Sequence, residues 1–88
     1  MVTKETIKRH FEAFEDVAVT LDLMEEEYDK TPNEETKEAL YLAVEEWTAM
    51  RTILINRIYK FLDGTVERKT IAFMLHHKRE ELKEIINR

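Results

Sequence analysis

The chain has 88 residues, of which 43% are hydrophobic and 38% are charged, and its formal net charge is −5. This composition is typical of a single globular domain with a small core and excludes a disordered chain. The absence of Cys excludes a disulfide framework and a thiolate metal site, and one Gly and one Pro leave little material for turns.

Two breaks divide the chain into three predicted helices, at about residues 4–29, 32–62 and 66–87. The first break contains Thr31 and Pro32, because Thr can cap a helix and Pro suits the first helical position. The second contains Gly64, which can adopt the left-handed conformation that ends a helix. Short connections favour antiparallel neighbours, so we predict an all-α, up-down-up bundle of three long antiparallel helices in one domain, residues 1–88.

Each predicted helix repeats apolar residues at helical spacing along one face. Further apolar residues lie off the main face, on the opposite side of the second helix and on the third. Scattered exposed apolar residues are ordinary in soluble proteins. Because the core is small, we favour a second packing surface through which the chain forms a homodimer. The candidate apolar interface consists of Leu42, Ala49, Ile53 and Phe73.

Charge is sorted along the sequence, with −11 on residues 12–46 and +4 on residues 47–88. A hairpin of the first two helices would gather the carboxylates at its turn, where they could bind a protein partner or merely select the register of the bundle. We expect the third helix to return toward that end and to neutralise part of its negative charge with Lys78, Arg79, Lys83 and Arg88. The candidate acidic partner face consists of Glu25, Glu26, Glu27, Asp29, Glu34, Glu35 and Glu38.

Arg51 interrupts the apolar stripe of the second predicted helix. The register of the hairpin places it near Glu12 and Glu15 of the first helix. We interpret these residues as a partly buried ion pair that fixes the register, with the aliphatic stem of the arginine on the core. A functional arginine is the alternative interpretation.

No motif predicts catalysis or a bound cofactor. Residues 34–38 (EETKE) have the E-E-x-x-E spacing with which MazG-type nucleotide pyrophosphohydrolases hold Mg²⁺, but no later helix supplies the E-x-x-D carboxylates that complete the oxygen shell. His76 and His77 are adjacent, so they project about 100° apart and cannot both face one ion. The chain also lacks Cys, Ser and a Gly-rich loop. We therefore expect no catalytic, cofactor or metal site.

The first ten residues, MVTKETIKRH, lack the apolar core of a signal peptide, and no run approaches about 18 apolar residues. We expect a cytoplasmic protein with no membrane partner. The predicted function is a non-enzymatic helical protein–protein interaction module, an adaptor, scaffold or regulator that forms a homodimer. The alternative is a small acidic inhibitor that mimics nucleic acid and blocks a DNA- or RNA-handling protein, as accessory proteins of phages and mobile elements do. A net charge of −5 argues against direct nucleic-acid binding.

Overall fold

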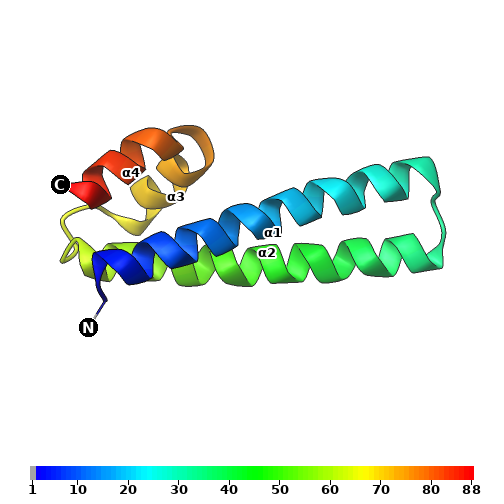
Figure 1. Cartoon of the computed structure of the whole chain (residues 1–88), viewed down its shortest axis with the longest axis horizontal. Coiled ribbons are helices and arrows are strands. Elements are labelled where there is room, and N and C mark those ends of the chain that lie inside the picture. The colour runs from blue at the N-terminus through cyan, green and yellow to red at the C-terminus, as the bar shows by residue number, and fades with distance from the viewer. Residues whose placement is uncertain (1) are drawn as a thin grey trace.

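A computed structural model describes residues 2–88, which form four helices and no strand. These are α1 (Lys4–Lys30), α2 (Glu34–Phe61), α3 (Arg68–His77) and α4 (Arg79–Asn87). Helices α1 and α2 form a long antiparallel hairpin, and α3 and α4 fold back over one end of it (Figure 1). The molecule is elongated, at 45 × 24 × 20 Å. The all-α prediction is confirmed, whereas the predicted count of three helices is wrong.

The α1–α2 turn contains the first predicted break, but its capping residues differ from those expected. Thr31 ends α1, and its backbone N–H donates to the carbonyl of Glu27 at 2.9 Å. Asn33 caps α2, because its Oδ1 accepts from the Thr36 N–H at 2.9 Å while the Thr36 hydroxyl accepts from the Asn33 N–H at 3.1 Å. This reciprocal capping box starts α2 at Glu34, two residues after the predicted start.

The second predicted break, at Gly64, lies where α2 ends. Asp63 and Gly64 have φ angles of 52° and 71°, and the Gly64 N–H donates to the carbonyl of Tyr59 at 3.0 Å. A Cβ on Gly64 would lie 3.2 Å from the hydroxyl oxygen of Tyr59. A left-handed turn therefore reverses the chain here, as the glycine predicts.

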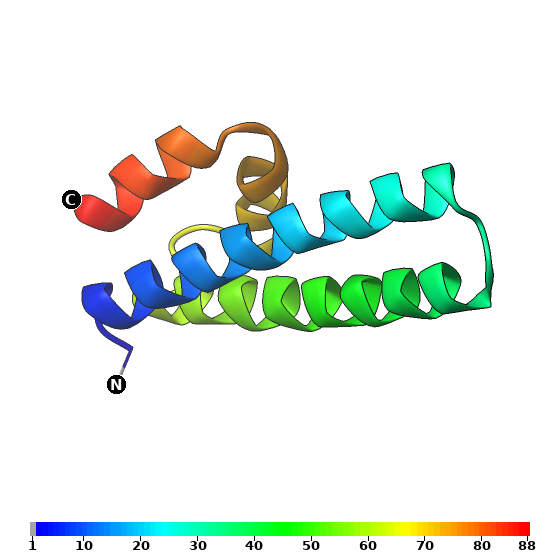
Figure 2. The same ribbon diagram turned by 45° about the vertical axis from the view of Figure 1, so that its right-hand side comes forward.

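The third predicted helix, residues 66–87, is interrupted at Lys78, whose backbone has φ −139° and ψ 50°. The Lys78 N–H still donates to the carbonyl of Met74, at 2.7 Å, and the Lys78 carbonyl still accepts from Leu82, at 3.1 Å, so the break is a single residue. It turns α4 back along the hairpin, so that α4 ends beside the start of α1, where the Lys4 ammonium donates to the Asn87 carbonyl at 3.1 Å (Figures 1 and 2).

The fold divides the molecule into two regions, which we name the base (residues 2–15 and 47–88) and the arm (residues 16–46). The base has three layers, because α3 and α4 cover the hairpin there, and the arm is a bare two-helix hairpin (Figure 2). In the arm only Ala43 is a buried hydrophobic residue. The core of the base consists of Ile7, Phe11, Phe14, Leu54, Ile55, Ile58, Ile71, Met74, Leu75, Leu82 and Ile86.

Candidate interaction surfaces

The side of α2 that faces away from the core carries three of the four predicted interface residues. Leu42 and Ile53 are 62% and 44% exposed, and Ala49 is also exposed. Seven and eleven residues after Leu42, Ala49 and Ile53 lie within about 20° of it around the helix. We name these three residues the outer face of α2. The structure therefore brings them together on one free surface.

Phe73, the fourth predicted interface residue, lies on another surface. It belongs to α3, is 53% exposed, and its ring centroid lies 4.9 Å from that of His77. The buried residues of α3, Ile71 and Leu75, pack into the core, and Phe73 projects about 200° from Ile71 around the helix. It points away from the hairpin and does not extend the outer face of α2.

The seven predicted acidic residues surround the α1–α2 turn at the free end of the arm. All seven side chains are exposed. Glu34 and Glu35 occupy the first turn of α2, where the helix dipole favours negative charge. None of the ion pairs formed within residues 2–88 involves any of the seven. The arm carries eleven carboxylates against two lysines, a net charge of −9, and the base carries +4.

The expected neutralisation of this end by the third helix is wrong. The break at Lys78 keeps α4 over the base, so its basic residues reach only as far as Glu15. The Arg79 Nη1 lies 3.7 Å from the Glu15 Oε2, and the Lys83 Nζ lies 3.0 Å from the Glu15 Oε1. The acidic end of the arm therefore remains uncompensated among the described residues.

Arg51 does not form the predicted ion pair with Glu12 or Glu15. Its Nε–H donates to the Nε2 of His76 at 2.8 Å, which joins α2 to α3. Glu15 is instead occupied by Arg79 and Lys83. The ring of His76 also lies 5.6 Å from that of Trp47. The predicted register of the first two helices gave no information on α3.

The two histidines that contact arginine have a pKa below the usual value for an imidazole. Burial and the charge of Arg51, with smaller contributions from His77 and Arg79, lower the pKa of His76. Burial and Arg57 likewise lower the pKa of His10, whose ring lies against the Arg57 guanidinium. A neutral imidazole can accept from arginine, whereas a protonated one would oppose it. Sequence reasoning missed both contacts, which join residues on different helices.

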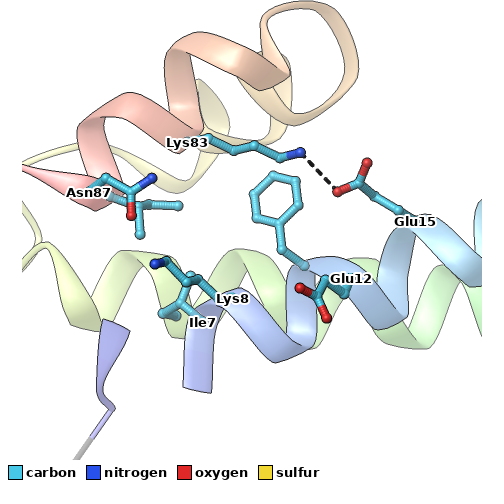
Figure 3. Close-up of a pocket in the computed structure, with 8 residues that line it drawn as sticks. Ile7, Lys8, Glu12, Glu15, Lys83 and Asn87 are labelled. Carbon is cyan, nitrogen blue, oxygen red and sulfur yellow. Dashed lines mark ion pairs between the residues drawn. The ribbon is translucent and has the colours of Figure 1, made fainter. Parts of the chain in front are cut away.

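A shallow pocket lies between α1 and α4 (Figure 3). Ile7, Phe11 and Ile86 supply its apolar lining, and the Lys83–Glu15 ion pair crosses its edge. Its volume of about 200 Å³ is below the range of about 300–1,000 Å³ that is usual for small-molecule sites. Within residues 2–88, no three His, Asp or Glu side chains are grouped so that they could hold a metal ion.

Within the same residues, every helix is too short or too polar to cross a membrane. Comparisons with protein-family models, curated proteins and solved structures find no match to this chain. The outer face of α2 and the acidic end of the arm are thus the two surfaces from which a function can be argued.

Proposed function

We propose that the chain is a non-enzymatic helical interaction module, an adaptor, scaffold or regulator of the cytoplasm, that works as a homodimer through the outer face of α2. The observation that carries the proposal is the alignment of Leu42, Ala49 and Ile53 on a side of α2 that the fold leaves bare. Three apolar residues in line on one helix form a continuous surface, unlike isolated exposed apolar residues, which are common.

The energetics favour association through this face. Full burial of an aliphatic side chain stabilises by about 1.5–3 kcal/mol, and a two-fold interface buries each residue twice. The core of a single copy is confined to the base, and the arm has only Ala43 buried. A second hairpin packed along α2 would support the arm, since a two-helix layer gains stability when a further layer covers it.

Sedimentation equilibrium at micromolar concentration tests this proposal. We expect twice the monomer mass of 10.6 kDa for the wild-type chain. Leu42→Glu should shift the equilibrium to the monomer, because it places a charge inside the interface. Val19→Glu is the matched control, since Val19 is 58% exposed on α1 and lies outside the face. A wild-type monomer at these concentrations would refute the homodimer, and equal effects of both substitutions would refute the assigned face.

A second candidate function is supported by the uncompensated acidic end of the arm. A rigid hairpin with a net charge of −9 over residues 16–46 resembles the charge density of nucleic acid. Such a surface would occupy the basic groove of a DNA- or RNA-handling protein and would be steered to it electrostatically.

Affinity capture with two versions of the chain tests this second function. In one version, the seven acidic residues of the predicted face are changed to Gln or Asn. A captured nucleic-acid-binding protein that is lost with the neutral version and at high salt supports mimicry. If the same proteins are captured after these carboxylates are neutralised, mimicry of nucleic acid is excluded.

A further inference from the structure

The outer face of α2 is one segment of a longer row that is charged at both ends. Glu35 and Lys60 lie within about 20° of Leu42 around the helix, and all three side chains are exposed. Glu38 and Arg57 lie at opposite edges of the row, and the Arg57 guanidinium lies against His10. Glu46, which is also exposed, lies about 40° from Leu42 on the same side as Arg57. The row therefore runs from Glu35, through Leu42, Ala49 and Ile53, to Lys60.

We infer that two copies of the chain pack these rows antiparallel, with the two-fold axis passing the middle of α2 between Trp47 and Thr48. This inference rests on the homodimer proposed above and specifies its geometry. Since α2 extends from Glu34 to Phe61, such an axis pairs residues whose numbers sum to 95. The pairs between the two copies are Leu42 with Ile53 and Glu35 with Lys60.

Charge complementarity selects this arrangement over the parallel one. A parallel pair would place Glu35 opposite Glu35 and Lys60 opposite Lys60, which is repulsive at both ends. The antiparallel pair opposes Glu35 with Lys60 and Leu42 with Ile53, and it places Glu46 opposite Ala49 and not opposite the Glu46 of the other copy. It also lays the arm of each copy, at −9, beside the base of the other, at +4. The acids of α1 near the turn, which lie outside the row, remain free.

Glu35 and Lys60 cannot meet within one copy. They are 25 residues apart on one helix, a separation of about 37 Å along its axis. Any energetic coupling between them therefore passes between copies. This separation makes a charge exchange between the two positions a specific test of the inferred register.

The experiment measures the dimer dissociation constant of four variants by sedimentation equilibrium at low salt. Lys60→Glu and Glu35→Lys should each weaken the dimer about 10- to 30-fold, because the two-fold axis turns one substitution into two repulsive contacts. The double variant, which exchanges the charges, should return to within about threefold of the wild type. Lys69→Glu is the matched control on α3 and should change the constant by less than about threefold.

A change in the stability of the monomer cannot explain the expected recovery of the dimer in the double variant. Lys at residue 35 and Glu at residue 60 both oppose the dipole of α2, so the double variant should be the least stable monomer and yet recover the dimer. If the wild type is a dimer and both single variants dissociate with the same constant as the wild type, the antiparallel register is overturned. A double variant that dissociates more readily than either single variant would overturn it too. Both results leave the homodimer itself intact. A wild-type monomer would overturn both.

Discussion

The base and the arm are two ends of one hairpin, and they differ in what covers them. In the base, α3 and α4 form a third layer, and eleven residues make one buried core. In the arm, Leu21, Met24 and Leu40 follow the same helical spacing but remain half-buried, because no third helix lies over them. Apolar periodicity thus marks the side of a helix that faces a neighbour, while the number of neighbours decides how far it is buried.

The largest expected effect is the loss of stability when an apolar side chain is truncated, which should be greater in the base than in the arm. Leu54→Ala in the base removes a fully buried side chain, and we expect a loss of about 3 kcal/mol in the free energy of unfolding. Leu40→Ala in the arm removes the same group from a half-buried position, and we expect less than about 1.5 kcal/mol. Urea denaturation measures both values. Equal losses would mean that the arm is buried as deeply as the base.

The next effect concerns the turn that places α3 over the base. Gly64→Ala forces a Cβ into a left-handed backbone with φ 71°, at a cost of about 1–2 kcal/mol. Gly64→Asn should cost less, because Asn tolerates this conformation better than Ala does. Thermal denaturation of the two variants compares them. An Ala variant as stable as the wild type would show that the base does not depend on this turn.

A smaller effect is expected at the opposite end, in the capping box of the arm. Asn33→Ala removes the acceptor of the Thr36 N–H and should cost about 1 kcal/mol. Asn33→Asp keeps an acceptor at the same position and serves as the control. If the arm unfolds locally before the base, the Ala variant should also speed hydrogen exchange in residues 20–44 more than in the base. Uniform acceleration along the chain would indicate one cooperative unit.

The smallest expected effect is on pH dependence, and it belongs to the base alone. The pKa of His76 in the folded chain lies below its usual value of 6.5, so the unfolded chain takes up the proton first as the pH falls. Stability from this site is therefore complete above about pH 7 and is lost as the pH falls below 6.5 toward the folded pKa. Melting temperatures from pH 8 to 5 measure the loss, which should be smaller in His76→Gln. If the melting temperature of that variant depends on pH as steeply as that of the wild type, a group other than His76 causes the pH dependence.

The long helices and the Gly64 turn could be predicted from the sequence because each has a local cause, in apolar spacing or in backbone freedom. The break at Lys78 could not, since neither Gly nor Pro marks it and the apolar residues on both sides would share one face of a continuous helix. The one available signal is the pair Glu80 and Glu81, which lie in the first turn of α4, where a helix start favours acids.

The interaction surfaces show the same difference between features with a local cause and features that depend on the path of the chain. Leu42, Ala49 and Ile53 share one side of a single helix, so helical spacing alone placed them together. The predicted pairing of Arg51 considered only the first two helices, and the predicted neutralisation of the acidic end assumed a continuous third helix. Arg51 contacts His76 of α3 instead. Because Lys78 turns α4 back, Arg79 and Lys83 pair with Glu15 and not with the acids of the arm.

Distance measurement between two spin labels tests the antiparallel homodimer most directly. The chain has no Cys, so Glu34→Cys, at the exposed start of α2, would carry the only label in each copy. The inferred axis pairs residue 34 with residue 61 of the other copy, which separates the two labels by about 40 Å along the helix. A distribution centred near that distance is the predicted result. A distance below about 20 Å, as in a parallel pair, or no dipolar signal at all would contradict it.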